Sequence, residues 1–466
     1  MSRVSALSLF AIVPLILLLS SASMSRADDA QSPDLSAADA AFDSGQYAKA
    51  YSLYNASAKD GVLGYEAQVG VARCFMEVKQ YTESESAFDE AIKLDDNRFE
   101  AYAGRGMAKW LQDKNKDAIV DLQRAIEIND QSVDGWLYLA LSNQSLGKHD
   151  DALKLFDKAV ALDDQRWFSF FQRAKTHLAL DDPAAAIADY TRAIEINPNN
   201  TNAHRQRAIA YQQQEQYAEA IADINQRLAV LPLDTDSIEI RAEIYQASEE
   251  LLMSARDYSA LIGMNTNVPE SLKSRGGCYM ELELYQASID DYLAASKLAP
   301  DQWTYANLAT CYEYLDEYEK VDGFYTEALK LDPEYELALV WRAYARQRLK
   351  RFTEAKADYL AALKAGADDD PIALGNLSWL LSGCPDETVR DGRLALELAT
   401  KANELYEGKQ AWVVDNIAAA HAELGDFDNA VTWVQKAIEL AESEEEQADI
   451  RTRLELYQNK QPARIE

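Results

Sequence analysis

Six arginines in this chain are each followed, sixteen residues later, by an aspartate. The pairs are Arg105 with Asp121, Arg173 with Asp189, Arg207 with Asp223, Arg241 with Asp257, Arg275 with Asp291, and Arg342 with Asp358. Six other segments carry apolar residues at both places, as Leu139 and Leu155 do. Positions that vary together usually touch. We therefore expect ion pairs that hold a scaffold together, in preference to a charged functional site.

Residue types that commonly carry catalysis are sparse. The four histidines are His149, His177, His204 and His421, which lie in different segments. The chain has no H-E-x-x-H, G-x-S-x-G, paired C-x-x-C or phosphate-binding loop motif. The sequence therefore predicts a protein that is not an enzyme and that uses neither a cofactor nor a metal ion.

The four cysteines fit packing positions better than a disulfide framework. Cys74, Cys278 and Cys311 each follow a recurring small residue by two places, where other segments have alanine. Equivalent residues of stacked helical hairpins lie beyond the roughly 7 Å Cα separation that a disulfide spans. No bridge between Cys278 and Cys311 is expected. Cys384 lies in a longer loop, where a structural turn residue and a reactive thiol are both open.

The elements that position these residues recur every 34 residues. One small residue recurs at Ala50, Ser84, Ala118, Ala152, Ala186, Ala220, Ser254 and Ser288. A second small position lies twelve residues earlier, and a third lies seven residues later, at Ala91, Ala125, Ala159, Ala193 and Ala295. Prolines stand at the turn into the next repeat, at Pro198, Pro232, Pro300 and Pro333. Small residues at recurring positions, followed by a proline that ends the second helix, predict a helical hairpin in each repeat.

This combination resembles the tetratricopeptide repeat family over roughly residues 31 to 440, with about twelve repeats. The resemblance implies an all-α, right-handed superhelical solenoid of helical hairpins. Six extra residues enter one repeat, most of them within 382–392, between its two helices. The segment from Asn376 to Leu405 looks like a variant repeat found near the C-terminus of many bacterial members, which indicates a bacterial source.

The predicted solenoid occupies residues 28–440, and residues 441–466 form a capping helix and tail. Ser443-x-x-Glu446 has the pattern of a capping box at a helix start. An apolar stripe follows at Ile450, Leu454 and Tyr457. This stripe is expected to seal the last hairpin.

Residues 1–27 have the pattern of a secretory signal peptide: a basic start, an apolar run from Ala6 to Leu19, and Ser25-Arg26-Ala27 before an acidic stretch. An uncleaved membrane anchor is the alternative, but the run is shorter than the roughly 20 residues of a spanning helix. No later stretch is apolar enough to span a bilayer. We expect an exported protein, periplasmic or secreted.

The formal net charge of −32 disfavours nucleic acid and anionic lipid surfaces as partners. It fits either the solvated outer faces of a long solenoid or a preference for basic ligands. Aromatic and aliphatic residues recur at helical spacing on the predicted first helices, and polar or acidic residues follow them. These candidate groove residues are Met107, Trp110, Leu137, Leu141, Phe168, Phe171, Leu178, Arg205, Asp236, Glu239 and Glu243.

Exposed apolar rows on an inner wall are expected to be covered by a partner. The alternative is that tight curvature buries them against neighbouring helices. If the rows line an open groove, the predicted partner is a protein or peptide with apolar anchors and a basic end. The alternative function is a structural spacer or self-assembling component of a cell-envelope complex.

Overall fold

The computed structural model describes residues 35–59 and 64–465, which form α-helices and one 3-10 helix, with no strand in these ranges. The predicted signal peptide, residues 1–27, lies outside the described residues. The chain divides into two compact units, Met1–Asp182 and Pro183–Glu466. The all-α fold predicted from the repeat is therefore present in both units.

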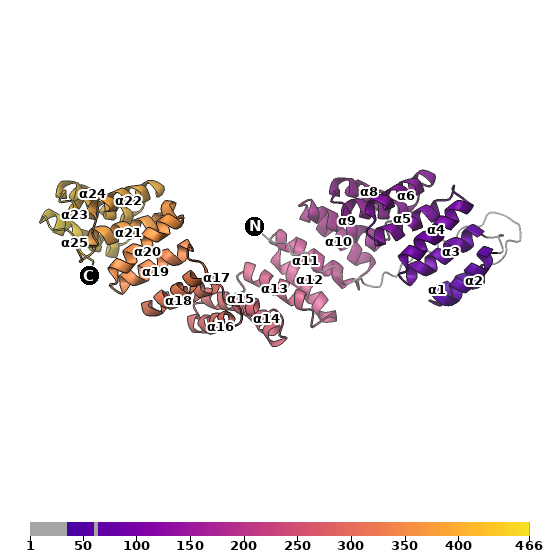
Figure 1. The fold of residues 1–466 in the computed structure, drawn as a ribbon, viewed down its shortest axis with the longest axis horizontal. Coiled ribbons are helices and arrows are strands. Elements are labelled where there is room, and N and C mark those ends of the chain that lie inside the picture. Colours follow the sequence, from indigo (N-terminus) through magenta and orange to yellow (C-terminus); the bar gives the residue numbers. More distant parts are fainter. Residues whose placement is uncertain (1–34, 60–63, 466) are drawn as a thin grey trace. The chain divides into compact units, whose positions relative to one another are not determined.

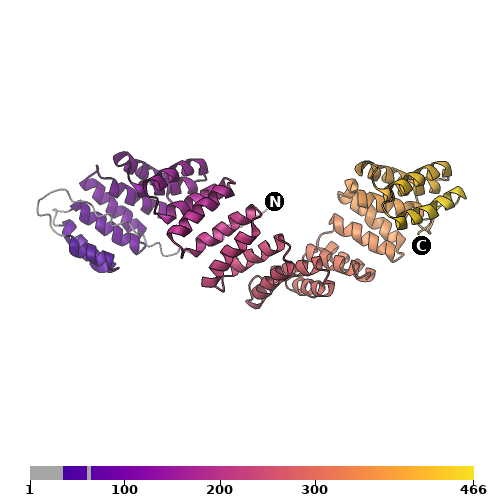
Figure 2. The same ribbon diagram turned by 180° about the vertical axis from the view of Figure 1, so that it is seen from behind.

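The helices of the first unit are α1 (Ser36–Asp43), α2 (Tyr47–Lys59), α3 (Gly64–Glu77), α4 (Tyr81–Leu94), α5 (Phe99–Leu111), α6 (Asn115–Ile128), α7 (Val133–Ser145), α8 (His149–Leu162) and α9 (Trp167–Ala179). Helices α1 to α8 form four hairpins, each of two packed antiparallel helices (Figures 1 and 2). Helix α9 follows as the last helix of this unit.

The second unit begins with α10 (Pro183–Ile196), α11 (Thr201–Gln213), α12 (Tyr217–Val230), α13 (Thr235–Ala247), α14 (Leu251–Gly263), α15 (Val268–Glu281), α16 (Tyr285–Leu298), α17 (Gln302–Glu313) and α18 (Tyr318–Leu331). It continues with α19 (Glu336–Arg348), α20 (Phe352–Ala365), the 3-10 helix η1 (Ala367–Asp369), α21 (Pro371–Gly383), α22 (Gly392–Leu405), α23 (Ala411–Glu423), α24 (Phe427–Leu440) and α25 (Glu444–Gln458). Helices α11 to α24 form seven packed hairpins.

The recurring small residues lie where the two helices of a hairpin approach each other. Ala118 and Ala125 of α6 are fully buried. A Cβ atom on Gly106 of α5 would lie 2.5 Å from Cγ of Leu122, so only glycine fits there. At Ser84 and Ser288 the hydroxyl donates to a carbonyl of the first helix, of Ala72 at 2.9 Å and of Gly276 at 2.7 Å. The 34-residue pattern is thus a pattern of close helix contact.

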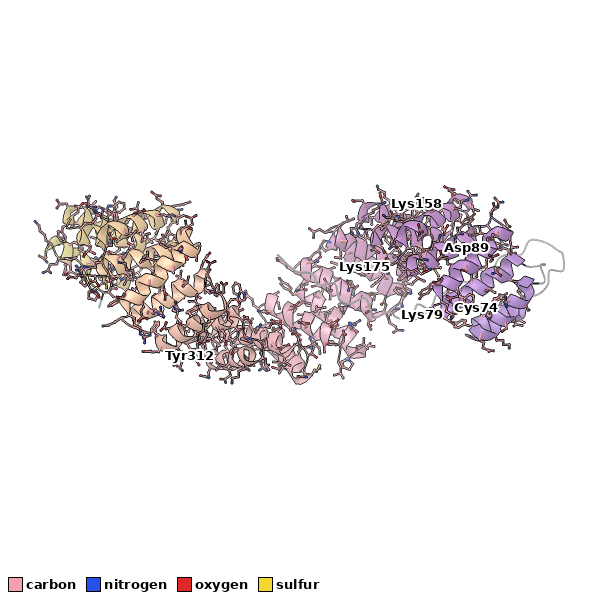
Figure 3. The ribbon with its side chains drawn as sticks, in the orientation of Figure 1. Cys74, Lys79, Asp89, Lys158, Lys175 and Tyr312 are labelled. Atoms are coloured by element: carbon pink, nitrogen blue, oxygen red, sulfur yellow. The ribbon has the colours of Figure 1, made fainter. Side chains whose placement is uncertain are left out.

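The turn between the helices of a hairpin repeats one backbone conformation. A residue with positive φ recurs there, and most examples are not glycine, such as Lys79 (φ 61°, Figure 3) and Glu215 (φ 57°). Gly147 (φ 74°) takes this place in one turn. The left-handed conformation ends the first helix.

The predicted inter-helix insertion becomes the segment between α21 and α22. Arg390 within it donates to the Cys384 carbonyl at 2.9 Å and pairs with Glu423 at 2.8 Å. The C-terminal tail reaches the same place, because the Ile465 amide donates to the Gly383 carbonyl at 2.7 Å. Cys384 is fully buried in this assembly.

The four cysteines are free and buried (Cys74 is labelled in Figure 3). Cys311 shares a hydrogen bond with Ser288 at 3.3 Å, and the Cys278 thiol donates to Ser254 at 3.4 Å. Burial raises the pKa of Cys74 to about 11. These thiols are therefore core residues with little thiolate character.

Helix α25 begins with the predicted cap, since Oγ of Ser443 accepts from the Glu446 amide at 3.1 Å. Ile450 and Tyr457 are buried against α23 and α24, and Leu454 is partly buried. Among the described residues, no helix has the length and apolar character needed to cross a membrane.

Candidate functional site

The first helices of several successive hairpins contact one another. Helices α3, α5, α7 and α9 form one such series, as do α19, α21 and α23 in the second unit, where α11 also contacts α13. Among the described helices, successive second helices make no comparable contact. Helices α13, α15, α17 and α19 make no comparable contact with one another. Where successive first helices pack together, we call the side that they form the inner face.

Three of the predicted groove residues are core residues. Leu137 and Leu141 of α7 are 0% and 2% exposed, and Met107 of α5 is 5% exposed. The expectation that they line an open groove is wrong. Direct packing of α5 against α7 covers them within one apolar cluster, which is the burial that tight curvature produces.

The other predicted apolar residues of the first unit are only partly buried. Trp110 packs against Tyr138 with ring centroids 5.4 Å apart. Phe168 and Phe171 of α9 lie against Trp167, at 5.6 Å and 6.2 Å. Leu178 is also partly buried. These side chains therefore leave part of their apolar surface exposed on the first helices.

On α11 and α13 of the second unit the predicted groove residues are polar and acidic. Arg205 of α11 pairs with Asp236 of α13 at 3.2 Å. Glu239 and Glu243 lie one helical turn apart on α13, so their carboxylates share a face. Desolvation and the neighbouring Glu239 carboxylate raise the pKa of Glu243. A cation bound here would relieve that repulsion.

The structure brings together five of the six predicted ion pairs. In each, the arginine Nε and Nη2 donate to the two carboxylate oxygens of its aspartate. The Nε distances are 2.8 Å for Arg105–Asp121, 2.7 Å for Arg207–Asp223, 2.7 Å for Arg241–Asp257, 2.7 Å for Arg275–Asp291 and 2.8 Å for Arg342–Asp358. All five aspartates are buried. Arg173 and Asp189 lie in different units, and their pairing stays a prediction.

Each of the six arginines also makes a contact that sequence reasoning missed. Nη1 donates to a polar side chain sixteen residues earlier, on the second helix of the preceding hairpin. The acceptors are Asp89 (Figure 3), Asp157, Thr191, Asn225, Ser259 and Thr326. Their shared polarity was the available signal. All six arginines therefore join their own helix to the helix before it, and the five ion pairs also join the two helices of one hairpin.

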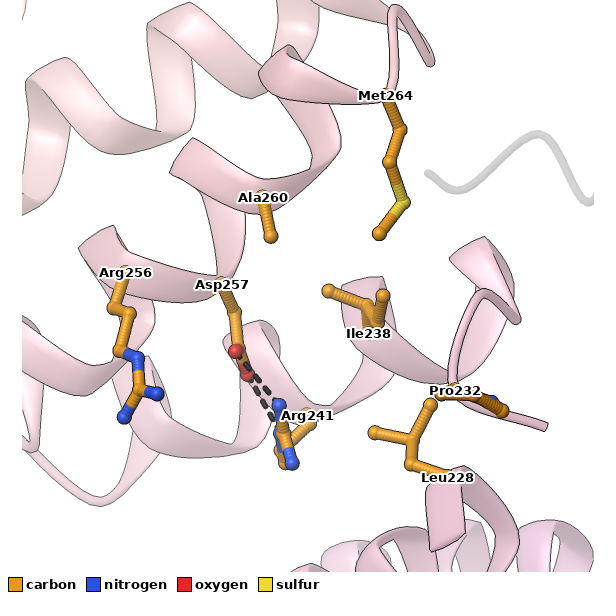
Figure 4. A pocket seen from close by; sticks show the side chains of 8 residues that line it. All are labelled: Leu228, Pro232, Ile238, Arg241, Arg256, Asp257, Ala260 and Met264. Atoms are coloured by element: carbon orange, nitrogen blue, oxygen red, sulfur yellow. Dashed lines mark hydrogen bonds and ion pairs between the residues drawn. The ribbon is translucent and has the colours of Figure 1, made fainter. Parts of the chain in front are cut away.

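A pocket of about 250 Å³ opens beside one of these ion pairs (Figure 4). It lies between the end of α12, α13 and α14. Its lining residues are Leu228, Pro232, Ile238, Arg241, Arg256, Asp257, Ala260 and Met264. At its edge Arg241 donates two hydrogen bonds to Asp257, which the dashed lines in Figure 4 mark. The walls are mainly apolar, and Arg241 and Asp257 already pair with each other.

Sequence profiles described as tetratricopeptide repeat or TPR repeat match residues 35–99, 104–166, 174–215, 304–338 and 415–444, about half of the chain. The chain is a tetratricopeptide repeat protein. The repeat register read from the small residues therefore belongs to this family.

A curated relative of this tetratricopeptide repeat protein is the mitochondrial import receptor subunit TOM70 of Saccharomyces cerevisiae strain YJM789. The two are 36% identical over 84 residues, which are 18% of this chain. The matched segment spans only 14% of the relative's own length.

Solved structures with similar folds include a tetratricopeptide repeat protein from Parabacteroides merdae ATCC 43184, at 16% identity and a TM-score of 0.38, covering 53% of this chain and 98% of that one. Another is Naa15/Naa10 bound to HypK-THB, at 16% identity and a TM-score of 0.41, covering 84% of this chain and 66% of that one. Similarity at this level describes architecture and carries no argument about function.

Within residues 35–59 and 64–465, no group of three or more histidine, cysteine, aspartate or glutamate side chains is arranged to hold a metal ion. Two of the histidines contact a nearby aspartate. His204 Nδ1 lies 2.8 Å from Oδ1 of Asp223, which also accepts from Arg207. His421 lies 3.2 Å from Asp426 at a helix end.

The burial of Leu137 leads to a testable difference from a groove residue. Leu137→Ala is expected to destabilise the first unit by about 2–5 kcal/mol, because it leaves a cavity in a packed core. Val120 of α6 is exposed, and Val120→Ala should change stability by less than about 0.5 kcal/mol. Hydrogen exchange of α5 and α7 amides measures both. Unchanged protection in Leu137→Ala would show that Leu137 is not a core residue and would support its prediction as a groove residue.

Proposed function

We propose that this tetratricopeptide repeat protein is an exported, non-catalytic scaffold that recognises other proteins or peptides through the inner faces of its hairpins. The observation that carries the proposal is the partly exposed aromatic surface on the first helices of the first unit, made by Trp110, Phe168 and Phe171. Aromatic side chains are common anchors at protein interfaces because they bury a large area at small entropic cost.

The acidic helix α13, the first helix of its hairpin in the second unit, supports a preference for a basic ligand. Glu239 and Glu243 repel each other there, and desolvation already disfavours the Glu243 carboxylate. A basic group on the ligand would stabilise both charges. The net charge of the chain draws basic ligands to the surface as well.

Export belongs to the proposal because residues 1–27 have a secretory pattern. TOM70 is a mitochondrial import receptor subunit, which agrees with a recognition role for repeats of this kind. The partner is therefore sought among proteins of the cell envelope.

The test compares two variants after affinity capture from an envelope fraction has supplied a purified partner. Replacing Phe168 and Phe171 by serine should weaken that partner's binding at least about tenfold, since each buried anchor contributes roughly 1.5–3 kcal/mol. The measurement is calorimetric titration, with circular dichroism to verify that the variant is folded.

Val120→Ser is the matched control, because Val120 is exposed on a second helix of the same unit and should leave affinity unchanged. Equal affinities for a folded double variant would remove the aromatic surface from the proposal. Recovery of this protein alone, or of a fixed stoichiometric complex insensitive to both variants, would support a structural spacer instead.

A further inference from the structure

A second pocket, of about 230 Å³, lies on the inner face near the end of the second unit. Three helices line it: α21 and α23, which are first helices, and the capping helix α25. The lining residues are Asn376, Trp379, Trp412, Asp415, Asn416, Glu446, Asp449, Ile450 and Arg453. Because α25 contributes almost half of this wall, the capping helix completes a site that the repeats alone do not make.

Asp415 is the central group of this pocket. It lies on α23 and is only 4% exposed, and its Oδ2 forms an ion pair with Nε of Arg453 at 2.6 Å, although that Nε makes no hydrogen bond within the described residues. Its other oxygen, Oδ1, is buried and accepts no hydrogen bond from the described residues. Leaving a buried carboxylate oxygen unsatisfied is costly. A ligand that brings a donor to Oδ1 would recover this loss.

The charges around Asp415 select the kind of donor. Glu446 and Asp449 of α25 also line the pocket, so three carboxyl groups face one guanidinium, that of Arg453. Tyr457 of the same helix is a further neighbour of Asp415. Helix α21 contributes only uncharged groups to the pocket. The surplus of carboxylates favours a cationic donor over a neutral or anionic one.

The remaining walls suit an alkyl stem behind that cation. Trp379 and Trp412 line the pocket with their indoles, and Ile450 adds aliphatic surface. Gly375 lets the Trp412 ring pack tightly, since a Cβ there would lie 2.4 Å from it. The Arg453 guanidinium already lies over the Trp379 ring, 5.7 Å from its centroid. The Trp412 indole and Ile450 can cover the methylene groups of an alkyl stem.

We propose that this pocket, which we call the capping-helix pocket, binds a lysine side chain presented by a partner protein, with its ammonium group at Oδ1 of Asp415. The inference rests on the proposed recognition function and gives it one defined subsite. Charge complementarity and the unsatisfied Oδ1 carry the assignment.

The test titrates the full-length protein with Nα-acetyl-lysine N-methylamide and with its norleucine counterpart, which has the same stem and no ammonium group. Tryptophan fluorescence and calorimetry should show the lysine probe binding at least about tenfold more tightly than the norleucine probe. A lysine-containing pentapeptide should bind more tightly than the single residue, whereas a site for free amines would prefer the smaller probe. Equal binding of lysine and norleucine probes would overturn the proposal.

Asp415→Asn should reduce binding of the lysine probe at least about tenfold. Asp428→Asn, an exposed change on α24 outside the pocket, should leave it unchanged. If Asp415→Asn fails to fold, Asp449→Asn replaces it, with an expected threefold loss. Full binding by a folded Asp415→Asn variant, or no effect of Asp449→Asn, would contradict the assignment.

Lysine binding should also depend on pH. Desolvation raises the pKa of Asp415 to about 6, with Arg453 opposing the rise and Asp449 and Glu446 adding to it. Protonation removes the charge that the ammonium group needs, so affinity should fall as the pH drops from 7 to 5. The Phe168 and Phe171 variants should not alter this profile, which separates failure of this subsite from failure of the aromatic surface. A flat profile would contradict a role for the Asp415 carboxylate.

Discussion

Arg275→Leu is expected to destabilise the α15–α16 hairpin by about 3–5 kcal/mol, because it leaves the Asp291 carboxylate buried without its partner. Asp291 is 5% exposed and accepts from Nε and Nη2 of Arg275 at 2.7 Å and 2.6 Å. Its hydrogen bonds raise the pKa of Arg275. Asp291→Leu should be similarly costly, since the guanidinium loses both acceptors.

Replacing both residues by leucine should restore most of the loss. The chain itself uses this solution, because Leu139 and Leu155 occupy the equivalent places and pack in one apolar cluster. An apolar replacement of a buried pair is often neutral. A strongly negative coupling between the two substitutions is therefore expected, and additive losses would contradict direct energetic coupling of the pair.

The experiment should resolve stability by hairpin, because repeat arrays unfold in parts and a single global transition can average over them. Hydrogen exchange of α15 and α16 amides gives this resolution. Ser259→Ala is the matched control for the bond to the preceding repeat, since Nη1 of Arg275 donates to Ser259 at 2.8 Å. It should cost about 1 kcal/mol and lower protection in α14 as well.

Sequence periodicity predicted the hairpins well because close helix contact leaves a direct record in residue size. The position of Ala118 requires a small residue because the two helices of the hairpin meet there, and Ala118 is fully buried. The ion pairs were predictable for a related reason. A charged residue inside a hairpin requires a partner of opposite charge, so the positions of Arg275 and Asp291 are either both charged or both apolar from one repeat to the next. The small residues mark a contact that recurs along the chain, and the ion pairs mark one that charged residues make in some repeats and apolar residues in the others.

Burial on the inner face was not predictable in the same way. Leu137 and Phe168 belong to the same predicted apolar wall, yet Leu137 is fully buried and Phe168 is only partly buried. The difference depends on how closely neighbouring first helices pack, which residue type alone does not specify. The capping-helix pocket was missed because it pairs Asp415 of the last hairpin with Arg453 of α25, a helix outside the repeat register, so no periodicity relates the two residues.

One departure from the repeat was visible in the sequence, and its meaning became clear only in the structure. Arg227 occupies the third small position, where Ala193 and Ala295 stand in other repeats. It is 6% exposed and reaches two neighbouring first helices. Nε lies 2.6 Å from Oδ2 of Asp234, and Nη1 donates to Asn202 at 2.8 Å. This arginine therefore joins the starts of α11 and α13 to α12.

Arg227→Ala restores the residue common at this position, so the repeat pattern by itself predicts a neutral or stabilising change. The structure predicts the opposite. Removing Arg227 leaves Asp234 without its cation, leaves Asn202 without its donor, and empties a buried volume, with an expected loss of about 3–5 kcal/mol. Hydrogen exchange at the starts of α11 and α13 should detect it, whereas Arg256→Ala, an exposed arginine on α14, should leave those amides protected.

Acid titration of the same variant supplies a second readout. Burial alone would raise the pKa of Asp234, but hydrogen bonds from Arg227 and Ser237 lower it below its ordinary value. A lowered carboxylate pKa contributes stability above the unfolded-state pKa of about 3.9, and this contribution is lost as the pH falls through the folded value. Wild type should therefore lose an increment of stability between about pH 4 and more acidic conditions that Arg227→Ala lacks. If both proteins lose stability in parallel, the pairing of Arg227 with Asp234 does not stabilise the fold, and the arginine acts there only by filling space.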